Sequence, residues 1–170
     1  MPPETLTAAD DDATAAAPRA LDETDRRILR KVQEDARLSI AGLARHVDLS
    51  APGLQKRLRR LEESGVIERY VTIVNRQALG LGLLCFVQVT LAHHQAESVV
   101  AFRETVHEFA EVLECHYLTG EFDYLLKVVV RDHRHLETFL FERLTRIAGV
   151  DRIRTSIVLR EIKAAGALPI

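Results

Sequence analysis

The sequence has few cysteines and no long apolar run. Cys85 and Cys115 are the only cysteines among 170 residues, too few for a disulfide scaffold, and we expect both to be buried thiols in a reducing cytoplasm. No segment reaches the roughly 18 to 20 consecutive apolar residues that a membrane-spanning helix needs. The N-terminus lacks the basic segment and apolar core of a secretory signal. We therefore expect a cytoplasmic protein with no membrane partner.

Motifs for catalysis and for metal binding are also lacking. The sequence contains no Gly-rich phosphate loop, no Ser or Cys nucleophile with a placed base, and no isolated carboxylate pair. Histidines occur in small groups, such as His93-His94, Cys115-His116 and His133 with His135, which do not give three or four ligands at a recognised spacing. We expect no enzymatic activity, no metal and no cofactor.

The charge of the chain is nearly balanced but locally basic. The formal net charge is -2, which for the whole chain argues against a nucleic-acid binder, yet residues 55–60 contain four cations and no acid. A local cationic patch is what a regulated DNA-binding protein needs, because non-specific affinity rises with the number of phosphate contacts. The basic segment therefore indicates a surface for double-stranded DNA.

This basic segment lies within residues 49–67, where the sequence predicts a helix that begins after Ser50 and ends at Ser64-Gly65. Ser50 is a good N-cap, and Pro52 falls in the first turn, where its missing N–H does no harm. Leu54, Leu58 and Leu61 follow at helical spacing and form one apolar stripe. The pattern predicts a helix that packs on one side and is cationic on the other.

Two shorter helices are predicted before it, over residues 22–35 and 40–47, and an extended wing after it, over residues 66–74. Three short helices with a basic third helix are typical of a helix-turn-helix unit, whose third helix enters the major groove. Arg57 is nearer the packed side than the other cations, so a structural role stays open for it. We expect DNA contacts from the following residues: Ser50, Pro52, Gly53, Gln55, Lys56, Arg57, Arg59 and Arg60.

The chain as a whole is predicted to be α+β, with an N-terminal winged helix-turn-helix and a C-terminal ferredoxin-like βαββαβ domain. We expect a disordered tail over 1–20, the DNA-binding domain over 21–74, a glycine-containing hinge over 75–82 and the second domain over 83–170. The second domain has the order strand 83–91, helix 96–109, strands 112–119 and 122–130, helix 134–147 and strand 150–163.

The predicted sheet has two unlike faces. Alternate residues such as Cys85, Val87 and Leu126 form a face that the helices cover, and this set includes Phe122 and Leu159. The reverse face mixes apolar side chains with polar ones: Leu84, Phe86, Leu125, Val129 and Val158 with Gln88, Thr90, Lys127, Arg154 and Ser156. This face is too apolar for a monomer, so we expect a second copy of the chain to cover it in a homodimer.

Three motifs in the chain resemble a known family. They are LD.TD..IL over residues 21–29, LS..GL..R...LE..GVI over residues 49–67, and ECHYLTGEFDYLL over residues 114–126. They are similar to the Lrp/AsnC, or feast/famine, family. The resemblance implies a transcription regulator whose second domain binds a small effector, often an amino acid, and whose dimers assemble further, for example into octamers.

The resemblance also places the effector site, at the turn after the second predicted strand. It implies these residues: Tyr117, Leu118, Thr119, Gly120, Glu121, Phe122 and Asp123. Backbone N–H groups of a Gly turn suit a carboxylate, and Glu121 or Asp123 suits an ammonium group. A plain hairpin turn is the alternative for this segment. For the whole chain, a sirohaem-decarboxylase-like enzyme and a stand-alone effector-binding subunit stay open as alternatives.

Overall fold

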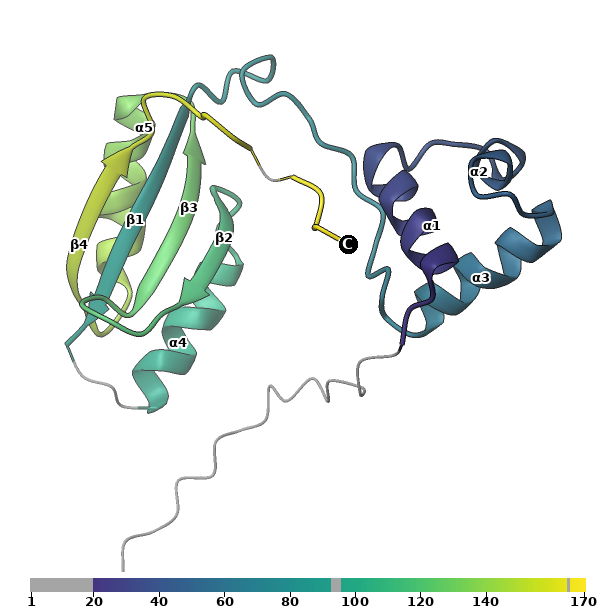
Figure 1. The fold of residues 1–170 in the computed structure, drawn as a ribbon. Helices are drawn as coiled ribbons and strands as arrows, with labels where there is room; N and C mark the ends of the chain where they lie inside the picture. Colours follow the sequence, from purple (N-terminus) through teal and green to yellow (C-terminus); the bar gives the residue numbers. More distant parts are fainter. Residues whose placement is uncertain (1–19, 93–95, 165) are drawn as a thin grey trace, which may run out of the picture. The chain divides into compact units, whose positions relative to one another are not determined.

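The computed structural model describes residues 20–92, 96–164 and 166–170, and the chain divides into two units (Figure 1). Unit 1 contains residues 20–71 together with 166–170, and unit 2 contains residues 72–164. The predicted domain bounds differ from this division at both ends of the second domain. The predicted disordered tail over 1–20 lies, apart from Ala20, outside the described residues.

Unit 1 contains three helices: α1 (Glu23–Glu34), α2 (Ile40–His46) and α3 (Ala51–Glu63). Each begins after a residue whose side-chain oxygen accepts a backbone N–H of the first turn, and these caps are Asp22, Ser39 and Ser50. The three predicted helices are therefore confirmed, each within two residues of its expected ends.

The core of unit 1 is built from the apolar stripes of these helices. Ile28 of α1 and Leu54 and Leu61 of α3 are completely buried. Around them lie further buried side chains: Leu29, Leu43, Ala44, Val47 and Leu58. The stripe predicted for α3 is thus its buried face, and most of the other residues of α3 are exposed.

The predicted wing does not form a hydrogen-bonded strand in this structure. Val66 and Ile67 pack against the unit 1 core, and the Ile67 N–H donates to the Leu61 carbonyl at 3.1 Å. The residues that follow, through Val74, belong to no strand among the described residues, and Ile73 is exposed. β-branched residues favour extended backbone, but a strand also needs a partner strand, which these residues do not have within the described chain.

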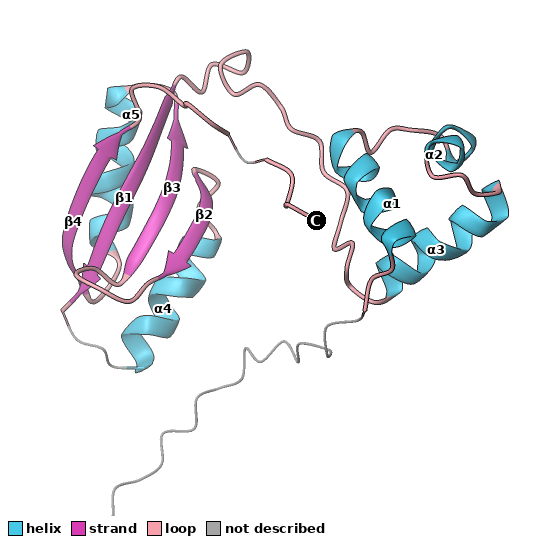
Figure 2. Ribbon diagram, viewed as in Figure 1, coloured by secondary structure: helices cyan, strands magenta, loops and turns pink. Residues whose placement is uncertain are grey.

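Unit 2 contains a four-stranded antiparallel sheet with its helices on one face (Figure 2). The strands are β1 (Leu83–Leu91), β2 (Val112–Tyr117), β3 (Tyr124–Val130) and β4 (Val150–Ile157), in the order β2-β3-β1-β4. Helix α4 (Ala96–His107) connects β1 to β2. Helix α5 (His133–Thr138) continues into a π-helical turn (Phe139–Arg143) and a 3-10 turn (Leu144–Arg146) before β4. The predicted ferredoxin-like βαββαβ fold is confirmed, with the last helix irregular.

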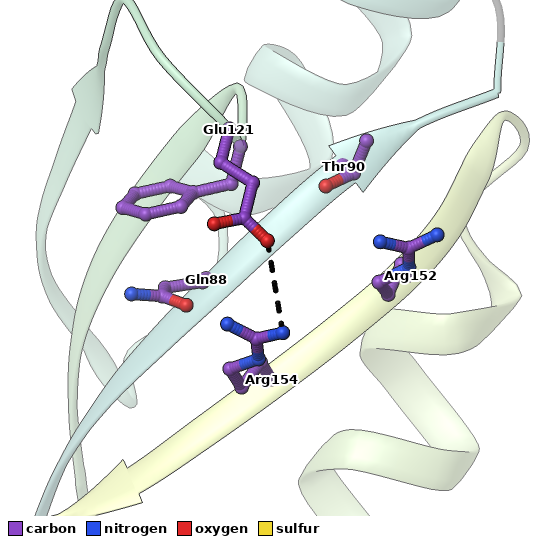
Figure 3. Close-up of a pocket in the computed structure, with 6 residues that line it drawn as sticks. Gln88, Thr90, Glu121, Arg152 and Arg154 are labelled. Atoms are coloured by element: carbon purple, nitrogen blue, oxygen red, sulfur yellow. Dashed lines mark ion pairs between the residues drawn. The ribbon is translucent and has the colours of Figure 1, made fainter.

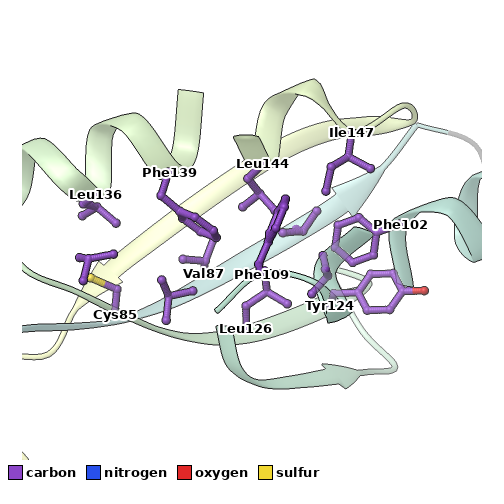
Figure 4. Close-up of a cluster of buried hydrophobic side chains, with 14 of the residues drawn as sticks. Cys85, Val87, Phe102, Phe109, Tyr124, Leu126, Leu136, Phe139, Leu144 and Ile147 are labelled. Carbon is purple, nitrogen blue, oxygen red and sulfur yellow. The ribbon is translucent and has the colours of Figure 1, made fainter. Parts of the chain in front are cut away.

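The core of unit 2 lies between this sheet and the helices (Figure 4). Cys85, Val87 and Leu126 of the sheet are fully buried, as are Phe102 of α4 and Phe139 at the start of the π-helical turn. Burial at this scale contributes roughly 1.5 to 3 kcal/mol for each large apolar side chain. The predicted helix-covered face is therefore the core face.

Two residues assigned to that face lie elsewhere, and both assignments are wrong. Phe122 precedes β3 and lines a hollow on the opposite face, because the turn does not continue the strand alternation. Leu159 follows the end of β4 and is exposed, because the strand ends at Ile157.

The predicted hinge over 75–82 is an ordered turn within unit 2. The Asn75 side-chain oxygen accepts the N–H groups of Gln77 and Ala78. Arg76 donates through Nη1 to the carbonyls of Leu81 and Gly82, and its guanidinium lies 3.6 Å from Glu161. These bonds hold the turn together within unit 2.

The C-terminal residues 166–170 pack on α1. Gln33 Oε1 accepts the Leu168 N–H at 2.6 Å, and Arg30 Nε donates to the Ile170 carbonyl oxygen at 2.7 Å. Ile170 also packs against the unit 1 core. Unit 1 is therefore built from both ends of the described chain.

Among the described helices, none is long and apolar enough to cross a membrane.

Candidate functional site

The exposed face of α3 is polar and cationic. Gln55, Lys56 and Arg59 are exposed and alternate with the buried leucines of the stripe. The Arg59 side chain is 79% exposed, and its Nε donates to Glu63 at 2.9 Å, one helical turn further on. Such a pair on a helix surface is worth only a few tenths of a kcal/mol, so Arg59 can exchange Glu63 for a phosphate.

The other two cations of α3 turn toward α1. Arg57 Nη1 lies 2.7 Å from Asp25 and 2.6 Å from Asp22, and Arg60 Nη2 lies 3.1 Å from Asp25. Hydrogen bonding to the two aspartates raises the pKa of Arg57, and the bond from Arg57 lowers the pKa of Asp22. Arg57 and Arg60 were predicted to contact DNA, but in this structure both guanidinium groups are engaged within the protein.

The remaining predicted DNA contacts form the start of α3. The Ser50 hydroxyl accepts the Gly53 N–H at 3.3 Å, and Pro52 occupies the first turn. A side chain on Gly53 would place its Cβ 3.1 Å from the Ser50 hydroxyl oxygen. The side chains of these three residues are small or compact, so the backbone at the start of α3 can approach a ligand closely.

The seven residues of the predicted effector site form the connection between β2 and β3. The Leu118 N–H donates to the Asp123 carbonyl at 2.8 Å and closes the connection. Gly120 has a φ of +136°, which L side chains rarely adopt. Thr119 and Gly120 are exposed. The turn is thus tight and glycine-dependent, as its sequence indicates.

Asp123 is occupied by a structural contact. Its carboxylate accepts the Leu91 N–H at 2.8 Å, and its own N–H donates to the Val89 carbonyl at 3.0 Å. These bonds join the turn to the end of β1. Of the two carboxylates considered for an ammonium group, Glu121 is therefore the one better placed to bind a ligand.

The structure separates the predicted effector residues onto two faces. The Tyr117 ring packs against the Tyr124 ring in a tilted arrangement, with centroids 5.2 Å apart, on the side of the sheet that the helices cover. Glu121 and Phe122 instead line a hollow on the open face of the sheet. The seven residues therefore do not form one pocket within a single chain.

This hollow, which we call the open-face hollow, contains two arginines. Its lining residues are Gln88, Thr90, Glu121, Phe122, Arg152 and Arg154 (Figure 3). The sheet register pairs Gln88 with Arg154 and Thr90 with Arg152. Arg154 Nη2 lies 3.7 Å from Glu121 Oε1. The arrangement places two positive charges, one carboxylate and polar groups around the hollow.

Sequence reasoning placed Gln88, Thr90 and Arg154 on the reverse face but missed Arg152. The sequence does place Arg152 on this face, because Arg152 and Arg154 are two residues apart on β4 and must therefore share a face. Their proximity to Glu121 depends on the pairing of β4 with β1, which local sequence does not give.

For metal ions, the described residues contain no group of three or more His, Cys, Asp or Glu side chains that could hold one. His93 and His94 lie outside the described residues.

Comparisons with known proteins cover both units. A model described as "Lrp/AsnC ligand binding domain" matches residues 84–168, and one described as "Winged helix-turn-helix DNA-binding" matches residues 21–68. The chain is 39% identical over 150 residues to the leucine-responsive regulatory protein of Klebsiella pneumoniae, covering 88% of this chain and 92% of that protein.

Two solved structures are similar over most of their length. A transcriptional regulator from Neisseria meningitidis, in complex with L-Met, matches with a TM-score of 0.85 and 35% identity, covering 88% of this chain and 97% of that one. An AsnC family transcriptional regulator from Agrobacterium tumefaciens matches with a TM-score of 0.83, 35% identity and the same coverage.

Proposed function

This chain belongs to the Lrp/AsnC family of transcriptional regulators, and on that premise we propose how it binds DNA and what controls it. Unit 1 reads double-stranded DNA through α3. An amino acid, bound at the β2–β3 turn of unit 2, changes the DNA affinity or the assembly state of the protein. Its site of action is the cytoplasm, where bacterial and archaeal DNA lies.

One observation carries the DNA-binding proposal: α3 buries its leucine stripe and exposes Gln55, Lys56 and Arg59 together. Gln can pair with an adenine edge in the major groove, while Lys and Arg bind phosphates or guanine. Ser50, Pro52 and Gly53 allow the helix start to approach the DNA backbone. Arg57 and Arg60 then serve chiefly to hold α3 on α1.

Support for an amino-acid effector comes from the relatives and from the turn. The Klebsiella relative is named as leucine-responsive, and the Neisseria structure is a complex with L-Met. In this chain the exposed turn at Thr119 and Gly120 adjoins Glu121, which can accept from an ammonium group. Effector binding is coupled to DNA binding if the effector binds one assembly state more tightly than another.

The open face of the sheet supports a homodimer, with further assembly such as an octamer. Phe86 is 37% exposed there, and Leu125, which pairs with Gln88 on the same face, is half-buried. A second copy packed on this face would remove apolar surface from water and would pair two α3 helices for two half-sites. The homodimer predicts a mass at least twice 19.1 kDa by light scattering, and a monomer at working concentration would contradict it.

The DNA-binding proposal is tested by gel shift on the DNA upstream of this chain's own gene, at a stated salt concentration, with and without mixed amino acids. We expect a specific shift that the mixture alters. The Lys56→Ala, Arg59→Ala double variant should lose the shift while keeping its helix content. The absence of any shift, on this fragment and on unrelated DNA at low salt, would favour a stand-alone effector-binding subunit.

A further inference from the structure

The exposed face of α3 has a complementary partner in the same chain, residues 1–19, which we call the acidic segment. We propose that Asp10, Asp11 and Asp12 of this segment dock on the cationic face of α3 and compete there with DNA, so that the segment lowers the affinity for any duplex. This inference rests on the proposed DNA-binding function and adds an internal competitor for the same surface.

The acidic segment and the start of α3 have opposite charges. Residues 1–19 contain four acidic residues, three of them consecutive, and a single basic one. On α3, Lys56 and Arg59 are exposed, and the first turn contains no acidic residue, so the positive end of the helix dipole has no carboxylate of its own. The acidic side chains of α3, Glu62 and Glu63, lie at its other end. A run of carboxylates is therefore attracted to the N-terminal half of this helix.

The acidic segment joins unit 1 beside α3. Asp22, near the start of the described residues, caps α1 and lies 2.6 Å from Arg57 Nη1 of α3. Asp12 is ten positions before Asp22, and a chain of that length can span up to roughly 33 to 36 Å. Helix α3, with thirteen residues, is only about 20 Å long. The three aspartates can therefore reach any part of α3 in their own chain.

The cations on the exposed face of α3 are available to a new partner. Arg59 and its partner Glu63 are 79% and 66% exposed, so water already competes with their ion pair. Arg57 and Arg60, by contrast, are engaged by Asp25. The homodimer proposed above uses the sheet of unit 2 and does not need this helix face.

Weak ion pairs are sufficient for this competition because the acidic segment is attached to the same chain. An exposed ion pair changes an equilibrium by at most about fivefold. Attachment through a short connection raises the effective concentration of the segment to the order of millimolar. DNA makes several phosphate contacts at once and can still displace the segment. The segment therefore reduces DNA binding without abolishing it.

Docking is tested by carbodiimide cross-linking of the full chain without DNA, because this reagent joins a carboxylate directly to an amine that touches it. We expect the tryptic peptide 1–19 to be joined to Lys56, and the yield to fall as added salt screens the charges. Lys163, an exposed lysine of unit 2, is the internal control and should not be joined. Equal yields at the two lysines would overturn the inference. A product of doubled mass on a denaturing gel would also overturn it, because the segment would then touch another copy of the chain.

Competition with DNA is tested by fluorescence anisotropy with a labelled duplex. The test variant keeps the length of the segment and removes three charges: Asp10→Asn, Asp11→Asn and Asp12→Asn. It should bind DNA about fivefold more tightly and with a steeper salt dependence, because DNA then displaces counterions instead of carboxylates. The control variant removes three exposed carboxylates of unit 2 and so changes the net charge equally: Glu97→Gln, Glu104→Gln and Glu108→Gln. Its DNA affinity should stay within about twofold of that of the unchanged chain.

The outcomes separate this inference from the proposed function. Unchanged DNA affinity of the test variant would overturn the competition, and an equal gain in the control variant would assign the effect to net charge alone. If neither the unchanged chain nor the test variant bound any duplex, the proposed DNA-binding function would be wrong. The cross-link to Lys56 would then decide by itself whether the segment docks on α3.

Discussion

Arg57 of the third helix reaches the buried carboxylate of Asp25 on the first helix, with Nη1 2.7 Å from Oδ1. Asp25 is only 1% exposed, and Arg60 contacts the same group. A buried carboxylate needs such partners, because leaving it unpaired costs several kcal/mol. Two of the four cations of α3 thus stabilise the position of the helix, while the other two stay on its exposed face.

Asp25→Asn should therefore destabilise unit 1. The change removes the charge that Arg57 and Arg60 share, and we expect a loss of about 2 kcal/mol, below the full cost for a buried pair because both arginines are partly exposed. Urea unfolding followed by circular dichroism measures it. Asp48→Asn is the matched control, since its pair with Arg27 is exposed and should be worth under about 0.5 kcal/mol. Equal effects of the two changes would contradict this role for Asp25.

The neighbouring residues Lys56 and Arg57 should differ in their effects on DNA binding. Lys56→Ala should lower the slope of log affinity against log salt by about 0.9, because one phosphate contact is lost. Arg57→Ala should lower the unfolding free energy and leave the slope unchanged. Fluorescence anisotropy with a labelled duplex at several salt concentrations measures the slope. A reduced slope for Arg57→Ala would mean that Arg57 also contacts DNA.

The helices of unit 1 could be predicted from sequence because their signals are local. The Ser50 cap and the Leu54, Leu58 and Leu61 stripe lie within one segment, and the structure has both. The partners of Arg57 and Arg60 could not be predicted, because Asp25 is more than thirty residues earlier in the chain. Helical periodicity gives the direction in which each side chain leaves the helix. A long arginine side chain can nevertheless bend from that direction and reach a partner on a neighbouring helix.

In the effector region, too, contacts between residues far apart in the sequence could not be predicted. The glycine turn at Gly120 was recognisable, and alternation placed Arg154 on the reverse face. However, the hollow unites Glu121 with residues about thirty positions before and after it, which depends on strand pairing. The structural use of Asp123 likewise depends on Leu91 of another strand. The predicted wing near Ile73 forms no strand among the described residues, because β-branched composition does not specify a partner strand.

Gly120→Ala should destabilise the turn through the backbone. The φ of +136° is strained for any residue with a Cβ, although the added atom would meet nothing within 4 Å. We expect unit 2 to lose about 1 to 3 kcal/mol of unfolding free energy and the effector affinity to fall. Thr119→Ala, in the same exposed turn, should cost much less. If calorimetry and urea unfolding find the two variants alike, the turn does not need glycine.

Acid should weaken unit 2 through Glu111. Burial would raise the pKa of this carboxyl, but hydrogen bonds from its own backbone N–H, from His135 and from Arg143, with the Arg143 charge, lower it below the ordinary 4.5. A carboxylate with a lowered folded-state pKa stabilises the fold above the unfolded-state pKa and loses that contribution as the pH falls through the folded value.

The stability of unit 2 should therefore decline as the pH drops below about 4.5. Urea midpoints between pH 7 and pH 3 measure the decline. Glu111→Gln should be less stable than the unchanged chain at pH 7, with a smaller difference at pH 3, whereas Glu108→Gln, an exposed control, should follow the unchanged chain. A constant difference for Glu111→Gln across this range would exclude the carboxylate as its source.

Removing residues 168–170 should destabilise unit 1, although they lie at the far end of the chain. The deletion removes the Leu168 bonds to Gln33, the Ile170 bond to Arg30 and the apolar contact of Ile170. We expect a loss of about 1 kcal/mol, since each exposed hydrogen bond contributes little. The same deletion in an Arg30→Ala, Gln33→Ala background should cost clearly less, because changes to contacting residues are not additive. Equal losses in the two backgrounds would mean that the C-terminal residues act on unit 1 through other groups.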